Sequence, residues 1–432
     1  MEFNEDFLQY VWKFRLFNLQ NLQTQEGQSL QIANAGIHNT HAGPDFENSK
    51  IKIGDTLWVG NVEVHLNSSD WLVHKHHTDE AYDNVILHVV FNHSQDVYRT
   101  NGTKIPVLVL ESLISAEVIS KYSSLMRNIN WIPCEHLINN VDQFHIKNWL
   151  SRVLMERLED KIAHVTALLT ELNGSWDDAF YIMLAKNFGF KTNALPFEML
   201  ARSLPQQLLA KNKNHPKSIE ALLFGQAGLL FENHADDYPK SLFKEYVYLQ
   251  KKYDLKPIST STWKFMRMRP RNFPTIRLAQ FSALILNSNH LFSKILDIRN
   301  ENDLTKTFEG LNINSYWDTH FVFDSPSNFS SKKMGKQSIH NILINTVAIF
   351  LFAYGKFFKL PSYINDAVIL LESLPTEKNE IVDKFKNLGV VIDKAFTSQA
   401  LLQLKSSYCN QKKCLSCGIG IKLLSANNLG IK

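Results

Sequence analysis

The sequence contains few cysteines and no long hydrophobic stretch. Four thiols in 432 residues are too few for the disulfide framework of a secreted protein, and they point to free thiols or metal ligands. The most apolar segment, residues 345–355, is too short to cross a bilayer and predicts a buried helix. The opening MEFNEDFLQYVWKF lacks the basic start and apolar stretch of a secretory signal. We therefore expect a cytoplasmic protein with no membrane segment.

An excess of one charge sign is also missing. The net charge is +4, with 20% charged and 44% hydrophobic residues, which is the composition of a soluble globular protein. The field of the whole molecule therefore does not identify a partner, and local clusters must do so. There is no internal repeat, and the Lys336 region has no GxxxxGK[ST] phosphate loop.

The hydrophobic pattern changes near residue 140, from strand-like before to helical after. In the first part we expect a helix at 5–17 and a helix at 76–83, with strands at 29–37, 48–54, 56–66, 84–91 and 105–111. Gly54-Asp55 predicts a hairpin turn. In the second part we expect helices at about 142–172, 176–188, 194–204, 217–232, 240–253, 275–288, 337–357, 363–374, 378–388 and 395–407. The pattern predicts an α+β protein with an N-terminal α/β domain over 1–135 and a large all-helical domain over 136–432.

Two carboxylates and a histidine form the first candidate site. Glu63 and His65 lie two apart on a predicted strand, so they project from the same face. If strands 48–54 and 56–66 form a hairpin, Asp45 lies beside Glu63. Two carboxylates on adjacent strands suit a hard divalent cation such as Mg²⁺. Taken alone, however, Pro44-Asp45 is a common turn sequence.

This arrangement resembles the PD-(D/E)XK nuclease fold, which has a helix, three strands, a helix and a strand. Pro44-Asp45 and Glu63-Val64 match its motif as they stand, whereas His65 replaces the usual lysine. The resemblance implies a mixed sheet flanked by helices, with Asp45 and Glu63 binding Mg²⁺ or Mn²⁺. It also implies cleavage of phosphodiesters in nucleic acid, DNA in preference to RNA. In that family the lysine positions or activates the attacking water. His65 would take this role, or would bind the metal and favour Mn²⁺ or Zn²⁺.

Other histidines cluster near these residues in the sequence. His38 and His41 share the loop GIHNTHAGPDF with Asp45, and His74, His76 and His77 follow the Glu63 strand. We expect His38, His41 and His77 to be outer contacts of the site, and His38 and His41 could also contact phosphate. His74, His76 and His77 are expected to line the entrance to the site, and the alternative for these three is a solvated loop. His88 lies in an apolar stretch, which is typical of a histidine in the protein core.

Nearly the whole chain also resembles an uncharacterised bacterial family of unknown function. The segments that carry this resemblance are HAGPDF, GNVEVH, SSDW, AYDNVILHVV and RMRPRNFPTIRLAQ, together with a C-terminal cysteine cluster. This second resemblance implies no activity.

The cysteines form a second candidate site. Cys409, Cys414 and Cys417 have the spacing C-x4-C-x2-C, and Cys134 makes a fourth thiol. Four thiolates are what a structural zinc or an iron–sulfur cluster requires. The arrangement resembles the iron–sulfur staple of helicase-associated PD-(D/E)XK nucleases, except that Cys134 follows the nuclease-like core instead of preceding it. The alternative is ordinary thiols near the chain terminus.

A basic segment interleaved with aromatic residues is a candidate nucleic-acid contact. Residues 251–280 contain TWKFMRMRPRNFPTIRLAQ, in which Trp263, Phe265 and Phe273 alternate with arginines. Arginine binds phosphate bidentately and aromatic rings stack on bases. The four arginines are Arg267, Arg269, Arg271 and Arg277. The alternative is that the aromatic rings belong to the core and the arginines are solvated.

These features leave three functions open. The first is a metal-dependent nuclease with Asp45, Glu63 and His65 as its catalytic residues. The second is a nucleic-acid-binding protein that keeps a degenerate nuclease fold without activity. The third is a metallohydrolase of another class, with histidines as the main ligands. If the Asp45 and Glu63 carboxylates lie more than about 10 Å apart, the first and third fail, because metal–oxygen bonds are about 2.0–2.6 Å long.

Overall fold

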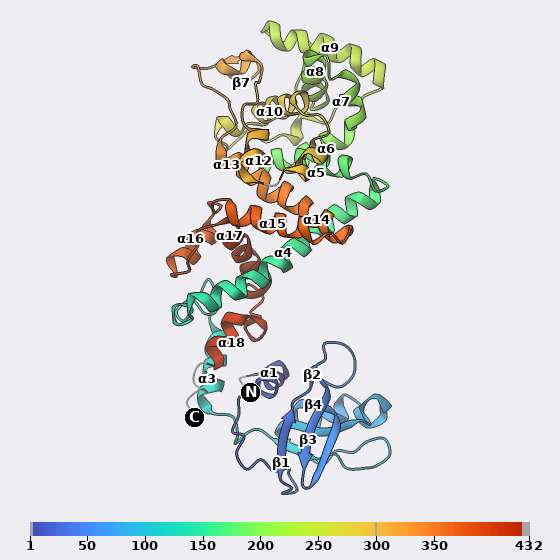
Figure 1. The fold of residues 1–432 in the computed structure, drawn as a ribbon, viewed down its shortest axis with the longest axis vertical. Coiled ribbons are helices and arrows are strands. Elements are labelled where there is room, and N and C mark those ends of the chain that lie inside the picture. Colours follow the sequence, from blue (N-terminus) through green and yellow to red (C-terminus); the bar gives the residue numbers. More distant parts are fainter. Residues whose placement is uncertain (1–2, 299, 426–432) are drawn as a thin grey trace. The chain divides into compact units, whose positions relative to one another are not determined.

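The computed structural model describes residues 3–298 and 300–425 of the chain (Figure 1). These residues form two compact units. Unit 1 contains the chain up to Trp149, the short segment Lys384–Val390 and the tail from Leu404 onward, whereas unit 2 contains Leu150–Asp383 and Val391–Gln403. The sequence pattern placed the division at 135/136 and assigned the tail to the helical domain. The structure differs because tail residues pack against elements that precede Trp149, and a local pattern does not reveal such contacts.

Unit 1 contains a mixed sheet of order β1-β3-β4-β5-β6, with β2 paired to β3. β1, β3 and β4 are antiparallel, whereas β4, β5 and β6 are parallel. The bounds are β1 Leu30–Asn34, β2 Ile37–His38, β3 Phe46–Ile53, β4 Thr56–Asn67, β5 Val85–Asn92 and β6 Val107–Val109. The expected hairpin at Gly54-Asp55 is confirmed: Ile53 pairs with Thr56, and Gly54 has the positive φ of 58° that such a turn requires.

Helix α1, Glu5–Phe14, packs against β4 (Figure 1). The Asn4 side chain caps its N-terminus by accepting the N–H of Phe7. Its apolar face is buried, with Phe7, Leu8, Val11 and Trp12 at 0% exposure. The polar residues Glu5 and Gln9 lie one turn apart on this helix, so they share a face.

A short crossover connects β4 to β5. The expected single helix at 76–83 is wrong: the crossover contains α2, Asp70–Val73, and the 3₁₀ turns η1, His76–Thr78, and η2, Glu80–Tyr82. The reason is local, because Lys75 has a φ of 62° and Asp79 is extended, so neither can continue a helix. The expected apolar strands at 84–91 and 105–111 are present as β5 and the shorter β6.

The rest of unit 1 is helical. The chain continues through α3, Ala116–Arg127, and the 3₁₀ turn η3, Ile138–Asn140, into α4, Gln143–Glu171. The unit boundary falls within α4, after Trp149. The tail adds a π-helical turn η8, Leu404–Cys409, a 3₁₀ turn η9, Cys414–Ser416, and α18, Gly418–Ser425. Helices α3 and α18 had not been predicted from the sequence.

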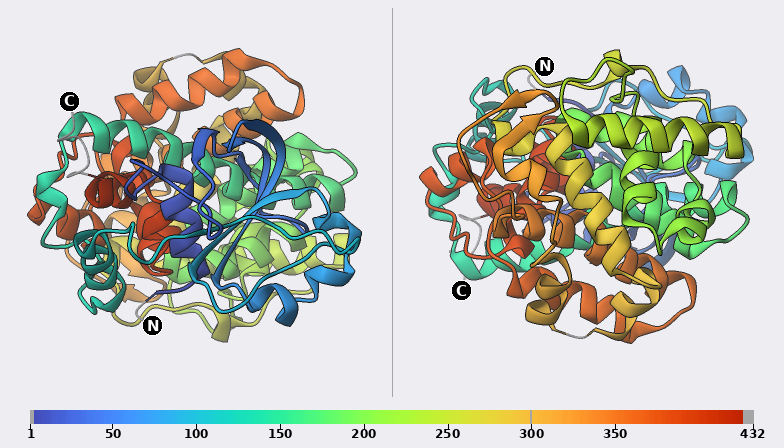
Figure 2. Two further views of the ribbon diagram at one scale, coloured as in Figure 1. Left: turned by 90° about the horizontal axis from the view of Figure 1, so that it is seen from below. Right: turned by 90° about the horizontal axis from the view of Figure 1, so that it is seen from above.

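Unit 2 is a large helical region, as expected (Figures 1 and 2). After α4 its helices are α5 Trp176–Phe188, α6 Phe190–Ser203, α7 Gln206–Asn212, α8 Pro216–Gln226, α9 Asp237–Tyr253, α10 Pro274–Asn287, α11 Leu291–Asp297, α12 Glu301–Phe308, α13 Lys336–Ile342, α14 Ala348–Phe357, α15 Pro361–Ser373 and α17 Ala395–Gln403. Helix α16, Glu380–Asn387, crosses the boundary between the units. A small hairpin, β7 His320–Val322 with β8 Ser325–Pro326, also belongs to unit 2, so this region is not entirely helical.

The most apolar helix is part of the core of unit 2. Lys336–Phe357 forms one continuous helix of 22 residues, long and apolar enough to cross a membrane by length and composition, but 72% of its apolar window is buried. The expectation of a buried helix at 345–355 is confirmed. The helix extends beyond this segment at both ends. Such burial is typical of a core helix.

Candidate metal centre

The loop that carries Asp45 is organised by Asn39. The Asn39 side chain accepts the N–H of His41 and donates to the carbonyls of Ala42 and Pro44. Its backbone N–H donates to the Asp45 carbonyl at 2.8 Å. Gly43 has a φ of 105°, a conformation that favours glycine. The polar loop therefore has a defined conformation and places Asp45 directly before β3.

Asp45 and Glu63 hold each other by reciprocal hydrogen bonds across β3 and β4. The Asp45 N–H donates to Glu63 Oε2 at 3.0 Å, and the Val64 N–H donates to Asp45 Oδ2 at 3.0 Å. Gln9 from α1 donates to Asp45 Oδ1 at 2.8 Å. A carboxylate lies within about 5 Å of its own backbone nitrogen. The two carboxylates therefore lie within about 8 Å of each other, and the metal-site hypotheses meet the 10 Å condition.

Both carboxyl groups are buried, and burial changes their acidity. Burial and the charge of Glu63 raise the pKa of Asp45 to about 7. Burial also raises the pKa of Glu63, to about 8. Holding two carboxylates ionised in one buried place costs free energy, and a bound cation is one way to offset that cost.

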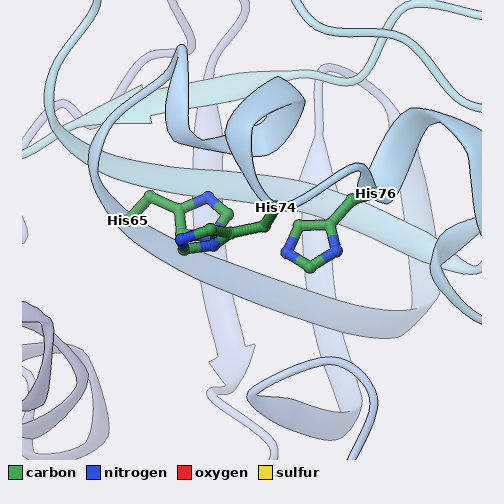
Figure 3. Close-up of side chains that lie close together, drawn as sticks. All are labelled: His65, His74 and His76. Carbon is green, nitrogen blue, oxygen red and sulfur yellow. Dashed lines mark hydrogen bonds between the residues drawn. The ribbon is translucent and has the colours of Figure 1, made fainter.

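Three imidazoles surround Glu63. His65 lies on β4 two residues after it, His74 follows α2, and His76 begins η1. One ligand atom from each of the three lies within 4.8 Å of the others, and this is the one such group of histidine, cysteine or acidic residues among the described residues. Figure 3 shows the three rings side by side, with His74 and His76 reaching from the crossover toward the strand that carries His65.

The separations between their ligand atoms suit one metal ion. His65 Nε2 lies 3.1 Å from His74 Nδ1 and 3.4 Å from Glu63 Oε1. His76 Nε2 lies 3.3 Å from the same Glu63 oxygen. Ligands bound at about 2.1 Å to a tetrahedral or octahedral ion lie about 3.0–3.4 Å apart. The three imidazoles form the group that could hold an ion, and Glu63 Oε1 lies beside two of them. His74 is exposed and His65 and His76 are buried, so the cluster is open to solvent at one side.

Neighbouring groups fix the orientation of these rings. His65 Nδ1 lies 2.9 Å from Nε2 of the fully buried His88. A hydrogen bond from His65 Nδ1 to His88 leaves Nε2 of His65 free to face Glu63 and His74, as in histidines that bind metals. Burial, followed by the neighbouring histidines, lowers the pKa of His65 to about 2, so its ring is neutral. His76 stacks on Tyr82 with ring centroids 3.7 Å apart, and Trp71 lies edge-on to His76.

Several residues at this site are not predicted by the sequence pattern. Asp45, Glu63 and His65 lie together, but His74 and His76 had been treated only as residues near the entrance. Glu5 also faces the cluster, since the charge of His74 lowers its pKa against a larger increase from burial. The sequence feature that could have indicated Glu5 is its spacing from Gln9, since residues i and i+4 lie on one face of α1.

The outer histidines occupy different places. His38 Nε2 lies 3.3 Å from Gln9 Oε1, so it reaches Asp45 through one intervening side chain. His41 and His77 are exposed. The expectation that His88 is a core histidine is confirmed by its burial.

The four arginines of the basic segment differ in their exposure to solvent. Arg267, Arg269 and Arg271 are exposed, whereas Arg277 is 4% exposed inside unit 2. The Arg277 guanidinium donates to Gln280, Asn272 and Ser338 and lies over the ring of Phe190. Arg277 therefore stabilises the start of α10 and is not available to bind nucleic acid. The other three predicted arginines are at the surface.

The fold and the site together define an α+β protein in which a mixed sheet presents a histidine and carboxylate cluster, joined to a helical unit. The chain belongs to the family described as protein of unknown function DUF2851, whose model matches residues 5–380. The match ends before Cys409, so the tail cysteines lie outside the matched residues. Nothing matches among curated proteins, and nothing matches among solved structures.

Proposed function

We propose that the protein is a metal-dependent hydrolase whose ion is bound by His65, His74, His76 and Glu63. The observation that carries the proposal is the grouping of His65, His74 and His76, whose ligand atoms all lie within 4.8 Å of one another. Glu63 is proposed as the fourth ligand because its Oε1 lies 3.4 Å from His65 Nε2 and 3.3 Å from His76 Nε2. Imidazole-rich sites prefer Zn²⁺ or Mn²⁺ to Mg²⁺, which favours water and oxygen ligands. When bound, such an ion lowers the pKa of a coordinated water and polarises the bond to be cleaved.

Asp45 is the proposed acid–base residue. Its oxygens already accept hydrogen bonds from Val64 and Gln9, which fixes the carboxylate beside Glu63 without making it one of the four ligands. Burial and the charge of Glu63 raise the pKa of Asp45 to about 7 in the ion-free protein. A cation on Glu63 would lower it again, so the position of Asp45 beside Glu63 is what supports this role. Asp45 would accept a proton from water and return it to the leaving group.

Nucleic acid is the proposed substrate class, with DNA preferred to RNA. Two features support it. The order of the sheet, with Asp45 ahead of β3 and Glu63 on β4, is the one that motivated the resemblance to PD-(D/E)XK nucleases. The exposed Arg267, Arg269 and Arg271 in unit 2 offer phosphate-binding groups. A cytoplasmic location is part of the same proposal.

The test combines metal binding with cleavage. The metal-stripped protein is supplied with Zn²⁺, Mn²⁺ or Mg²⁺ and incubated with single- and double-stranded DNA and RNA. We expect Glu63→Gln to lose both the metal and the activity. We expect Asp45→Asn to keep the metal within a few-fold and to lose about 10²–10⁴ in rate, as is typical for a general acid–base group.

The competing function is nucleic-acid binding without catalysis. Binding of DNA by wild type that is unaffected by metal, with no cleavage under any ion, supports that function and rules out the hydrolase. Metal binding that survives Glu63→Gln and His76→Ala unchanged would rule out the proposed ligand set.

A further inference from the structure

Unit 1 contains all four cysteines of the chain, which come from segments that are far apart in sequence. Cys134 lies in the turn between α3 and η3, where its carbonyl accepts the N–H groups of Leu137 and Ile138. The other three belong to the tail: Cys409 ends η8, Cys414 begins η9 and Cys417 follows it. In this part of the structure α18 packs against α3 and η3, and η8 packs against η9. All four cysteines are free thiols.

The four thiols interact electrostatically with one another. Charge on one thiol raises the pKa of another in each of the possible pairs, in addition to the larger effect of burial. Cys134, Cys414 and Cys417 are 7–8% exposed. Three buried thiols and the half-buried Cys409 interact electrostatically without a disulfide between them, and this arrangement needs an explanation beyond ordinary packing.

Cys414 and Cys417 lie in a tight turn that depends on its glycines. A Cβ on Gly420 would lie 2.3 Å from the Cys414 carbonyl oxygen, and one on Gly418 would lie 2.7 Å from the Trp149 ring. The Cys417 N–H donates to the Cys414 carbonyl at 3.3 Å. These close approaches fix the backbone that carries the two thiols. Burial raises the pKa of Cys417, and the backbone N–H groups of Gly420 and Ile419 act against this increase.

Two lysines of the tail add positive charge at the same place. Lys405 donates to the Trp131 carbonyl at 2.7 Å, and Lys412 donates to the Met126 carbonyl at 2.5 Å. Both bonds hold the tail against the segment that leads to Cys134. The ammonium of Lys405 lowers the pKa of Cys409, and that of Lys412 lowers the pKa of Cys414, against larger increases from burial. These cations favour a group with net negative charge.

The spacing of the sulfurs distinguishes between two occupants. Four thiolates on one zinc lie about 3.8 Å apart, since Zn–S bonds are about 2.3 Å long. No three of these four sulfurs, all on described residues, lie within 4.8 Å of one another. An iron–sulfur cluster holds its thiolates further apart, because each binds a different iron atom.

We propose that Cys134, Cys409, Cys414 and Cys417 bind a [4Fe–4S] cluster that fastens the tail of the chain to the turn after α3. Each thiol loses its proton to solvent and forms one Fe–S bond. Ferrous iron, an equal amount of ferric iron and sulfide are supplied from outside the protein, so assembly of the cluster requires no further oxidant. No position is left open for a substrate, so the role is structural. Because the cluster joins segments separated by more than half of the chain, its binding free energy becomes folding free energy for the tail.

The test measures iron, acid-labile sulfide and zinc in full-length protein purified without oxygen, and again after anaerobic reconstitution with equal amounts of ferrous and ferric iron together with sulfide. We expect about four iron and four sulfide per chain, with a broad violet-blue absorption. Cys417→Ser and Cys134→Ser should lose most of both. Ser416→Ala is the matched control in the same turn, where the side chain is exposed, and it should keep the full content.

Stoichiometric zinc without sulfide overturns the proposal, as does wild type that binds no iron and sulfide after reconstitution. Full cluster content in Cys134→Ser also overturns it, because the fourth ligand would then come from elsewhere. The wild-type measurements decide the matter even if a serine variant fails to fold. This proposal and the proposed hydrolase can fail independently. His74→Ala should lose affinity for the hydrolase metal and should keep its iron and sulfide.

Discussion

At the scale of single residues, Glu63 has the most demanding position in unit 1. It is 4% exposed, and one of its oxygens lies within 3.4 Å of both His65 and His76. Its other oxygen accepts the Asp45 N–H. A buried carboxylate requires partners for both oxygens. Here one oxygen is satisfied by the backbone and the other faces imidazole nitrogens, so the side chain is fixed before any ion binds.

His74 offers a direct test of the ligand set, because it is exposed and its removal leaves no core cavity. We expect His74→Ala to weaken Zn²⁺ or Mn²⁺ binding by more than about 100-fold, since groups that merely hydrogen-bond to a ligand contribute about 10–100-fold. Titration calorimetry on metal-stripped protein measures the Kd. His77→Ala is the control, because His77 is exposed and belongs to the same crossover. Equal Kd values in the two variants would exclude His74 as a ligand.

Glu220 in α8 provides a pH-dependent prediction away from the site. It is 8% exposed, and burial raises its pKa to about 7, against a smaller opposing effect of Tyr238. The unfolded value is about 4.3. The folded state therefore binds more protons between about pH 4 and 7, and the free energy of unfolding falls as pH rises through that window.

We expect Glu220→Gln to remove this fall. Relative to wild type, the variant should gain about 2–3 kcal/mol in unfolding free energy between pH 5 and pH 8. Urea unfolding at the two pH values measures the difference. Glu232→Gln, at an exposed position, should show no such gain. A parallel pH response of wild type and Glu220→Gln would contradict the prediction.

At the scale of elements, the crossover between β4 and β5 controls the site. Its first turn is held by Ser68, which is fully buried. The Ser68 hydroxyl accepts the N–H groups of Ser94 and Gln95 at 2.9 Å and donates to the Gln95 carbonyl at 2.7 Å. This hydroxyl ties the start of the crossover to the end of β5, and thereby fixes where His74 and His76 begin.

Ser68→Ala should leave two buried N–H groups without their acceptor, at a cost of about 1–3 kcal/mol. We expect a lower melting temperature and a weaker metal Kd in the same variant, because the histidines lose their fixed starting point. Ser69→Ala is the control, since the Ser69 side chain does not cap α2. A loss of stability with an unchanged Kd would show that the crossover does not position the ligands.

Regular elements account for what the sequence predicted well. Glu63 and His65 were placed on one face by the two-residue period of β4, and Gly54-Asp55 gave the hairpin that brings Asp45 beside them. His74 and His76 were not assigned as ligands because their crossover has no period: the positive φ of Lys75 reorients the chain between them. The burial of Arg277 was equally hidden, since its partners Gln280 and Ser338 lie on different helices.

At the scale of the whole molecule, the tail belongs to unit 1 although all of unit 2 precedes it in the chain. Local pattern assigns a helix but not its neighbours, so the domain boundary at 135/136 followed from composition alone. The contacts of Lys405 with Trp131 and of Lys412 with Met126 span most of the chain length. One sequence contains no signal that pairs residues so distant, apart from the count of four cysteines.

The exposed arginines of unit 2 carry the last prediction, which concerns nucleic-acid affinity. Replacing Arg267, Arg269 and Arg271 together with alanine should remove up to three phosphate contacts. The slope of log K against log salt is about −0.7 per contact for single strands and −0.9 for duplexes, so it should become shallower by about 2–3. Fluorescence anisotropy over a salt series measures this slope.

The control removes the same charge elsewhere, through alanine at the exposed Lys191, Lys244 and Lys306. If the arginines contact phosphate, their slope changes and that of the lysine variant does not. Equal changes would mean that net charge alone governs binding. Metal affinity should stay unchanged in both variants, because the proposed ligands all belong to unit 1. A lower metal affinity in the arginine variant would therefore mean that the substitutions had disturbed the fold.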